Sequence, residues 1–266
     1  MQSMQEAALA SPGAAGESPA DFIVVDGLTK SFGSVVAVDA VSFSIRREEI
    51  FGLLGPNGAG KSTLIRMLAT VLPADAGDAT IGGFSVRHQA DRVREQIGVC
   101  PQEIALYEDL SGLDNLLFFG AMVGLERHRR RERADEILAA TGLTEHAHQR
   151  VSAFSGGMKR RLNVGVALMG RPALLFLDEP TVGIDPQSRN SIFEMVERLN
   201  GEGMCVVYTT HYMEEADRLC DRVAIIDNGR IAALDTPATL KARFGPPEKV
   251  TLEEVFLNLT GKRLRD

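Results

Sequence analysis

The chain has 266 residues, of which 44% are hydrophobic and 24% are charged, an ordinary composition for one large globular domain or one domain with an insert. Its 36 acidic and 29 basic residues give a formal net charge of −7, which argues against a general binder of nucleic acid. The apolar runs are far shorter than the roughly eighteen residues that a membrane-spanning helix needs, so the sequence predicts no span of its own.

Residues 1–20 are rich in Ala, Gly, Ser and Pro, and they lack the basic start and apolar centre of a signal peptide. We expect them to form a disordered tail. Two alternating segments, residues 22–32 and 41–45, then predict strands. Residues 48–55 indicate a buried strand, and residues 61–72 have the apolar spacing of a helix.

The segment between that strand and that helix, Gly55–Ser62, has the sequence GPNGAGKS and matches the phosphate-binding pattern G-x-x-x-x-G-K-[ST]. Its glycines would expose backbone N–H groups to phosphate oxygens. Lys61 would place a positive charge at the β- and γ-phosphates, and Ser62 would offer a hydroxyl to Mg²⁺. A glycine-rich turn without a ligand is the alternative, which the flanking strand and helix disfavour. The residues expected to bind nucleotide here are Gly55, Pro56, Asn57, Gly58, Ala59, Gly60, Lys61, Ser62 and Thr63.

Strand signals are absent from residues 103–170, where three helical patterns predict a helical insert. The first pattern starts at Ser111, with Asp114 in the position of a capping box. The second ends at Gly142 and contains a basic run over residues 127–133. Acidic residues within and beside this run favour a solvated helix face over a site for an anionic partner.

The third helix of the insert begins in the segment FSGGM, Phe154–Met158. A serine and two glycines at a helix start suit a bound phosphate, because close backbone N–H groups and the helix N-terminus favour negative charge. One nucleotide carries one triphosphate, and Gly55–Ser62 already supplies a cradle for it. A second cradle, formed by Ser155, Gly156 and Gly157, makes sense if it serves the nucleotide of another copy of the chain.

Strand and helix patterns alternate again from residue 172 onward, which predicts a mostly parallel sheet with covering helices. One of these strands ends in Asp178 and Glu179. In a protein with a P-loop, we expect the first carboxylate near Mg²⁺ and the second to polarise the water that attacks the γ-phosphate. Charges at the start of a helix are the alternative for this pair, and Pro180, which follows directly, weakens that alternative.

Two further polar residues, Gln102 and His211, each follow a predicted strand. The carboxyl ends of parallel strands border the same crevice of an open α/β sheet, so both side chains are candidates for the site. Gln102 could ligate Mg²⁺ or hold a water molecule. A purely structural role is the alternative for either residue, because a lone glutamine or histidine at a strand end is common.

The C-terminal segment and the cysteines indicate structural rather than catalytic roles. Thr251 and Glu254 form the pattern of a capping box before a C-terminal helix, whose apolar face must dock on the rest of the chain. The cysteines, Cys100, Cys205 and Cys220, lack CxxC spacing and are odd in number, which predicts small, reduced core residues.

Five motifs, GPNGAGKST, Gln102, FSGGM, LLFLDEPTVGIDP and TTHYMEEAD, occur in the order seen in ATP-binding subunits of ABC transporters, and the resemblance covers residues 22–245. It implies the ABC ATPase fold of the α/β class: a P-loop NTPase core with a mostly parallel sheet, an antiparallel β subdomain and a helical insert. The expected organisation is the tail over residues 1–20, an ABC ATPase domain over 21–245 with its helical subdomain at about 103–170, and a short C-terminal helical extension over 246–266.

The resemblance also implies a role for each matching residue. Phe32 stands where the family usually stacks a tyrosine on adenine, and phenylalanine keeps the ring face and loses only the hydroxyl. Glu179 would be the general base, His211 would contact the γ-phosphate, and Gln102 would sense both the γ-phosphate and the membrane partner. Asp185 would lie in the loop that crosses the dimer. The expected catalytic residues are therefore Glu179, His211, Gln102 and Lys61. The expected nucleotide contacts, in addition to the glycine loop, are Phe32, Ser155, Gly156 and Gly157. The expected Mg²⁺ ligands are Ser62, Gln102 and Asp178.

The FSGGM segment departs from the family pattern at both ends. The family segment usually begins with leucine and often ends with glutamine, whereas this one begins with Phe154 and ends with Met158. The Ser-Gly-Gly centre is intact, so we expect its function to survive.

Similarities over residues 97–125, 155–170 and 251–266 narrow the resemblance to the ATPase subunits of ABC-2-type exporters, the group that includes daunorubicin-resistance-like pumps. This implies ATP and Mg²⁺ as cofactors and a second copy of the chain as a head-to-tail partner around two ATP molecules. It also implies a separate transmembrane permease, through which the chain would attach to the cytoplasmic face of the cell membrane. Export rather than import rests on the resemblance alone, and nucleic acid is not an expected partner.

Two other classes of protein are alternatives. A soluble ABC ATPase acting on nucleic acid or ribosomes would carry a long coiled coil or a second ATPase domain, but the short stretch between Gln102 and Phe154 has no sustained heptads and the chain has one P-loop. A P-loop kinase or GTPase would leave FSGGM and His211 without a role.

Overall fold

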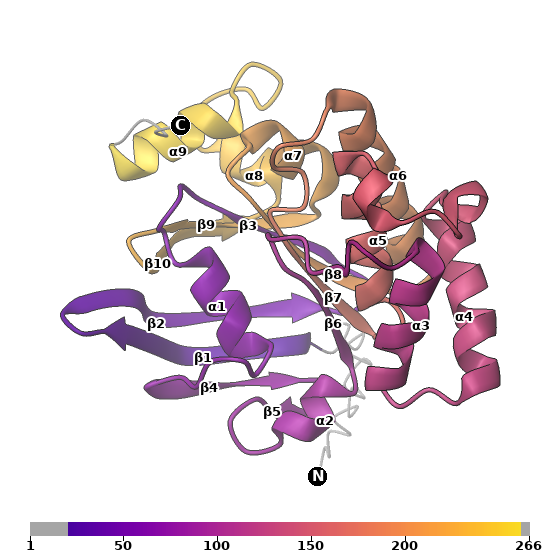
Figure 1. Ribbon diagram of the computed structural model, residues 1–266. Coiled ribbons are helices and arrows are strands. Elements are labelled where there is room, and N and C mark those ends of the chain that lie inside the picture. The colour runs from indigo at the N-terminus through magenta and orange to yellow at the C-terminus, as the bar shows by residue number, and fades with distance from the viewer. Residues whose placement is uncertain (1–20, 262–266) are drawn as a thin grey trace, which may run out of the picture.

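The computed structural model describes residues 21–261, which form two sheets and a group of helices around them (Figure 1). The expected tail, residues 1–20, lies outside the described residues. The larger sheet has six strands, and every neighbouring pair is parallel except β10 and β9. The order across it is β10 (Arg230–Asp235), β9 (Arg222–Asp227), β3 (Ile50–Leu54), β8 (Cys205–Thr210), β7 (Leu174–Asp178) and β6 (Ile97–Cys100).

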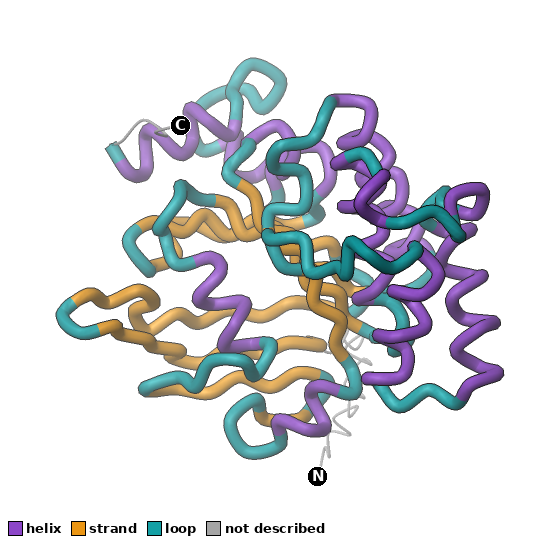
Figure 2. The backbone as a smooth tube through the Cα atoms, viewed as in Figure 1, coloured by secondary structure: helices purple, strands orange, loops and turns teal. Residues whose placement is uncertain are grey.

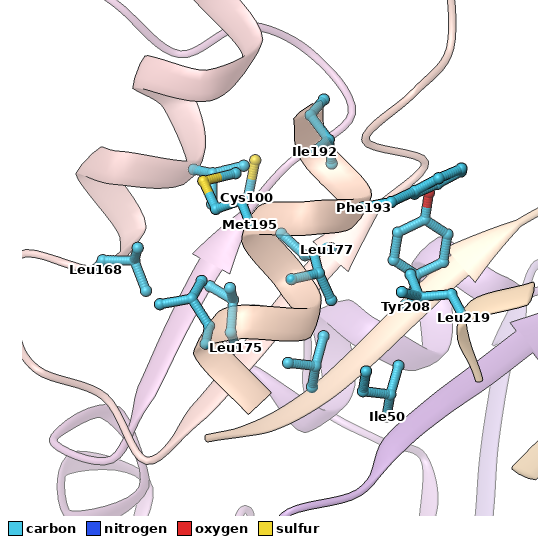
Figure 3. Close-up of a cluster of buried hydrophobic side chains, with 14 of the residues drawn as sticks. Ile50, Cys100, Leu168, Leu175, Leu177, Ile192, Phe193, Met195, Tyr208 and Leu219 are labelled. Carbon is cyan, nitrogen blue, oxygen red and sulfur yellow. The ribbon is translucent and has the colours of Figure 1, made fainter. Parts of the chain in front are cut away.

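Both faces of this sheet are covered, which explains why its central strands are apolar without alternation. All residues of β3, β7 and β8 are buried. Successive side chains point to opposite faces, so Leu175 and Leu177 join one hydrophobic cluster while Leu174 and Phe176 join the other. Figure 3 shows the first cluster, in which Leu175 and Leu177 lie close to helix α6 (Pro186–Gly201).

The second sheet is antiparallel, as the predicted fold class requires. Its strands, in spatial order, are β2 (Val35–Arg46), β1 (Asp21–Phe32), β4 (Ala76–Ile81) and β5 (Phe84–Ser85). Helix α1 (Lys61–Leu68) lies between the two sheets, and its buried side chains complete the second cluster (Figure 1). This packing fixes the start of α1, where Lys61 stands.

Strand β2 begins earlier than the sequence pattern predicted. We expected a strand over residues 41–45, but Val35 and Val36 already pair with the end of β1. The sequence signal is weak there because these valines are exposed and no polar residue alternates with them.

Three helices occupy the predicted insert: α3 (Gly112–Met122), α4 (Arg127–Ala140) and α5 (Gly156–Ala167). They lie together at one side of the molecule, away from the antiparallel sheet (Figures 1 and 2). Ser111 caps α3 by accepting a hydrogen bond from the backbone N–H of Asp114, as predicted. The basic run of α4 lies on an exposed helix face, where Arg131 pairs with Asp135 at 3.1 Å.

The C-terminal helix α9 (Leu252–Thr260) begins with the predicted capping box of Thr251 and Glu254. Its apolar face is buried in the first cluster, and the helix packs against α7 (Met213–Leu219), α8 (Pro237–Ala242) and β10. Helix α2 (Ala90–Arg94) was not predicted, because five residues are too few for a clear helical period.

The three cysteines are buried and none is paired in a disulfide, in keeping with their predicted role as core residues. Burial raises the pKa of the Cys100 thiol to about 11 and that of the Cys205 thiol to about 12, so both remain protonated thiols near neutral pH.

Candidate active site

The glycine loop follows β3 directly and ends in the first turn of α1, the strand–loop–helix context that the motif requires. Gly58 and Gly60 have left-handed backbone angles, with φ of 79° and 106°. A Cβ atom at Gly60 would lie 2.3 Å from the carbonyl oxygen of Ala37, so only glycine fits. The loop borders a pocket of about 290 Å³, which is lined by Ala37, Asn57, Gly58, Gly60, Lys61, Ser62, Thr63, Gln102 and Glu179.

Lys61 stands at the base of this pocket with its side chain only 4% exposed. Its ammonium donates hydrogen bonds to the carbonyl oxygens of Gly55, at 2.7 Å, and Pro56, at 3.1 Å. The same Nζ atom lies 3.0 Å from Oε1 of Glu179. A buried cation needs such partners, and here they hold the ammonium in place within the loop.

Glu179 is the centre of the pocket's polar side chains. Its Oε2 accepts a hydrogen bond from Nε2 of Gln102 at 3.3 Å and lies 3.3 Å from Nδ1 of His211. The backbone of Glu179 is left-handed, with φ of 47°, a conformation that costs a non-glycine residue energy and is typical of functional sites. The structure therefore brings three of the predicted catalytic residues, Lys61, Gln102 and His211, around the carboxylate of the fourth, Glu179.

Asp178, the last residue of β7, lies beside the predicted metal ligand Ser62. Oδ1 of Asp178 accepts hydrogen bonds from Oγ of Ser62, at 3.1 Å, and from Oγ1 of Thr209, at 2.7 Å. The Thr209 hydroxyl in turn accepts from the backbone N–H of Glu179 at 2.8 Å. Sequence reasoning missed Thr209, although it stands two residues before His211 on the neighbouring strand.

This donor set fits Mg²⁺. A magnesium ion is typically held by one or two protein oxygens together with substrate phosphates and water. Ser62 and Asp178 supply those oxygens, and among residues 21–261 no three His, Cys, Asp or Glu side chains form a metal-binding group by themselves. Gln102, the third predicted ligand, bonds to Glu179 in the structure, so its role as a metal ligand stays a prediction.

The segment with the second pair of glycines lies elsewhere. Ser155 caps α5 by accepting a hydrogen bond from the backbone N–H of Met158, and both Ser155 and Gly156 are exposed. A Cβ atom at Gly157 would lie 2.0 Å from Oγ of Ser188, so this glycine allows α5 to pack against the start of α6. None of these three residues lines the pocket of the glycine loop.

Asp185 caps the helix α6 against which Gly157 packs. Its Oδ1 accepts from the backbone N–H of Ser188 at 2.9 Å, and the hydrogen bonds from Ser188 hold the pKa of this carboxyl below its usual range. Asp185 is exposed, and it lies at the same edge of the molecule as the exposed residues of the FSGGM segment. Its assignment to the dimer-crossing loop stays a prediction.

Phe32 ends strand β1 with 52% of its side chain exposed. Nζ of Lys30 lies 5.8 Å from the ring centroid, and the ring does not line the pocket of the glycine loop. Its stacking on a base therefore stays a prediction.

Helix α5 also holds the Gln102 segment, which the sequence motifs did not indicate. Arg160 is 5% exposed and donates to the carbonyl oxygens of Gln102, at 2.7 Å, and Pro101, at 3.2 Å. Asn163, one turn further on, accepts from the backbone N–H of Ala105 at 3.1 Å. Hydrogen bonds thus connect helix α5, whose start is exposed, to the backbone of the segment that carries Gln102.

Comparisons with known proteins show the family to which the chain is similar. A family profile described as "ABC transporter" matches residues 38–182. The linearmycin resistance ATP-binding protein LnrL of Bacillus subtilis (strain 168) is 50% identical over 220 residues, which cover 83% of this chain and 71% of that protein. The doxorubicin resistance ATP-binding protein DrrA of Mycobacterium tuberculosis (strain ATCC 25618 / H37Rv) is 44% identical over 246 residues, which cover 92% of this chain and 72% of that protein.

Solved structures show the same fold. One, described as the structure of an ATP-binding subunit of an ABC transporter, has a TM-score of 0.79 and 28% identity, and the match covers 90% of this chain and 99% of that one. Another, described as a dimeric bacterial ABC transporter cassette, has a TM-score of 0.73 and 25% identity, with coverage of 80% and 98%.

Proposed function

The chain belongs to the ABC transporter family as one of its ATP-binding subunits, and from this we propose that it is the ATP-hydrolysing motor of a membrane exporter, working as a head-to-tail dimer around two Mg-ATP and driving a separate transmembrane subunit. As a member of this family it is an ATPase. The observation that carries the proposal is the convergence of Lys61, Gln102 and His211 on the carboxylate of Glu179 beside the glycine loop. Export is supported by relatives that are named for drug resistance or for Nod factor export.

The geometry supports the following chemistry. Backbone N–H groups of the glycine loop and the ammonium of Lys61 hold the phosphates of ATP. A phosphate in the loop competes with Glu179 for Lys61 and so leaves the carboxylate available to a water molecule. Glu179 then accepts a proton from that water. At the same time the water oxygen bonds to the γ-phosphorus, and the bond between this phosphorus and the β–γ bridging oxygen breaks.

The neighbouring side chains position this reaction. The amide of Gln102 and the imidazole of His211 both approach Oε2 of Glu179, where they can orient the carboxylate and the γ-phosphate. Ser62 and Asp178 would hold Mg²⁺, which neutralises charge on the phosphate oxygens. The bond from Thr209 to Asp178 fixes the carboxylate that would face the metal.

A shared site between two copies of the chain is supported by the placement of the two glycine segments. Ser155 and Gly156 are exposed at the start of a helix and do not line the pocket of Gly55–Ser62 in the same chain. A helix start of this kind attracts an anion, and a two-fold dimer would bring it to the γ-phosphate bound by the partner. ATP would then hold the dimer together, and hydrolysis would loosen it.

Mixing two inactive variants tests the shared site. In a dimer of one Lys61→Ala chain and one Ser155→Arg chain, one site is whole and the other carries both lesions. We therefore expect single-turnover ATP hydrolysis to reappear in mixed dimers, because the Ser155→Arg chain supplies an intact glycine loop and the Lys61→Ala chain an intact Ser-Gly-Gly segment. Differently tagged chains allow the mixed dimers to be purified and the exchange of subunits to be verified.

Ser152→Arg is the matched control, because Ser152 is also exposed and stands three residues before Ser155. This variant should hydrolyse ATP normally. Complete inactivity of verified mixed dimers in a single turnover would contradict the shared site, and the second glycine segment would need another explanation.

An exposed apolar patch supports a transmembrane partner. It consists of the exposed side chains of Tyr107, Phe118, Met122 and Val123, with the half-buried ring of Phe119 beside them, on α3, at its C-cap and on the segment that follows Gln102. The rings of Tyr107 and Phe118 stack edge-on at 4.8 Å, and Met122 is 69% exposed. Contiguous exposed apolar surface of this kind marks an interaction site. Among residues 21–261 no helix is both long and apolar enough to cross a bilayer, and we propose that this patch docks on the permease at the cytoplasmic face of the membrane.

A negative charge introduced into the patch should prevent the chain from binding its transmembrane partner without stopping ATP hydrolysis. We expect Met122→Glu to abolish sedimentation of the chain with membranes that contain its transmembrane partner, because a carboxylate would be buried in the interface. Val71→Glu is the matched control, since Val71 is 72% exposed but lies outside the patch. Equal sedimentation of both variants, or tight binding of the unaltered chain to protein-free liposomes, would argue against the patch as the docking surface. Failure to sediment with any such partner would favour a soluble ABC ATPase.

A further inference from the structure

A second carboxylate, that of Glu215 on α7, is buried close to the active site without being part of it. Its side chain is 2% exposed and accepts hydrogen bonds from three hydroxyl groups. Thr181 Oγ1 lies 2.8 and 2.9 Å from the two carboxylate oxygens, Thr210 Oγ1 lies 2.8 Å from Oε2, and the hydroxyl of Tyr208 lies 3.0 Å from Oε2. Nε of Arg189 on α6 approaches Oε1 to 3.6 Å.

The hydroxyl donors belong to the two chain segments that carry catalytic side chains. Thr181 stands two residues after Glu179, and Thr210 stands directly before His211. The hydroxyl of Thr210 also accepts from the backbone N–H of Tyr212 at 2.9 Å, so it fixes the turn on which His211 stands. Glu215 therefore bonds to the segment after β7 and to the end of β8 at the same time.

The third donor, Tyr208, anchors the carboxylate to the core. Figure 3 shows its ring among the apolar side chains of the first cluster, with the hydroxyl directed toward Phe193. Burial, together with the negative charge of Glu215, raises the pKa of Tyr208 well above its usual value, so its hydroxyl stays protonated and remains a donor.

A carboxylate in such a place needs an explanation beyond packing. Burying a charge is unfavourable before its partners compensate, and apolar residues of similar volume often stabilise a core as well or better. What an apolar side chain could not do is bond to both segments at once. The distance between Nδ1 of His211 and Oε2 of Glu179, 3.3 Å, depends on how those segments are held relative to each other.

We infer that Glu215 is a positioning residue for ATP hydrolysis, which ties the segment of Glu179 to the segment of His211 through the hydroxyls of Thr181 and Thr210 and so sets the geometry of the catalytic pair. The inference rests on the proposed role of Glu179 as the general base. Arg189 extends the connection to α6, the helix that Asp185 caps, and Glu215 thus joins three segments that converge on the site.

The experiment compares Glu215→Ala with Glu215→Gln in single-turnover ATP hydrolysis and in equilibrium ATP binding. We expect Glu215→Ala to lower the hydrolysis rate about 10- to 100-fold, as for a displacement of about 1 Å in a catalytic group, while ATP affinity stays nearly unchanged. Glutamine can still accept hydrogen bonds from the Tyr208 and Thr210 hydroxyls, so Glu215→Gln should retain most of the rate. A purely structural role would lower binding and hydrolysis together.

A second comparison uses the Glu179→Gln background. If Glu215 acts through Glu179, adding Glu215→Ala to Glu179→Gln should not lower the residual hydrolysis further. An undiminished rate in Glu215→Ala, or an equal further loss in the Glu179→Gln background, would overturn the inference. Near-normal turnover of Glu179→Gln alone would instead refute the proposed general base, so the two failures are distinguishable.

If Glu215→Ala does not fold, Thr210→Val removes one donor and leaves the carboxylate in place. Thr141→Val is its matched control, because Thr141 is likewise a buried threonine with a bonded hydroxyl but lies in the helical insert. We expect Thr210→Val to slow hydrolysis and Thr141→Val to leave it unchanged at comparable thermal stability. Equal hydrolysis rates in these two variants would overturn the inference.

Discussion

Glu179→Gln is expected to bind ATP normally and to hydrolyse it about 10²- to 10⁴-fold more slowly, the usual cost of losing a positioned general base. The substitution preserves the shape of the side chain, and an amide oxygen can still accept from the ammonium of Lys61, which lies 3.0 Å from Oε1. What the amide cannot do is take a proton from the attacking water. Because ATP then persists, the variant should accumulate as an ATP-bound dimer, which gel filtration with labelled ATP measures.

Glu214→Gln is the appropriate control for this experiment. It makes the same change of charge at an exposed neighbour of Glu215 on α7, where no contact with the pocket of the glycine loop exists. This variant should retain the normal rate. Near-normal turnover of Glu179→Gln would refute the assignment of Glu179.

The second large effect is expected for Lys61→Ala, which should weaken both ATP binding and hydrolysis. In its proposed role the ammonium contacts phosphate in the ground state and in the transition state, so its loss would affect both quantities. Isothermal titration gives the affinity and phosphate release gives the rate. Unchanged values of both would contradict the phosphate-binding role of the glycine loop.

Lys61→Ala should also lower the free energy of unfolding. Removing one partner of a buried ion pair costs about 3–5 kcal/mol where nothing compensates the remaining charge, and the carboxylate of Glu179 would be that charge. The double variant Lys61→Ala with Glu179→Gln leaves no such charge and should recover part of the loss in thermal denaturation. A single variant as stable as the unaltered chain would show that Glu179 does not depend on Lys61 for its burial.

The sequence predicted which polar side chains come together beside the glycine loop, because its motifs combine residue type with position. The glycine loop, the acids at the end of β7 and the histidine after β8 each follow a strand, and parallel strands bring such ends together. Helix caps were predictable for the same reason, since Ser111 and Thr251 act on backbone groups only three residues away. Structure that depends on residues close together in the chain could therefore be predicted from the sequence alone.

The side-chain network behind the site was not predictable. Thr209 bonds to Asp178 across two strands, and this pairing depends on the register of β7 against β8. Thr181 and Thr210 bond to Glu215 on α7, a helix that reaches both segments only in the folded chain. A single threonine carries no motif that reveals such a partner. The left-handed backbone of Glu179, whose N–H donates to Oγ1 of Thr209 on the neighbouring strand, was not predictable either.

The order of strands in the larger sheet has a consequence for the synthesis of the protein. Strand β3, which leads into the glycine loop, has β8 and β9 as its neighbours, and both come from the last third of the chain. A nascent chain leaving the ribosome therefore carries this wholly apolar strand without either partner until residues beyond 200 have emerged. Pairing across so many residues is slow, and an unpaired apolar strand is prone to associate with other chains. Strand β3 and the glycine loop that follows it are therefore among the last parts of the protein to fold. Chaperones have the longest interval in which to bind them.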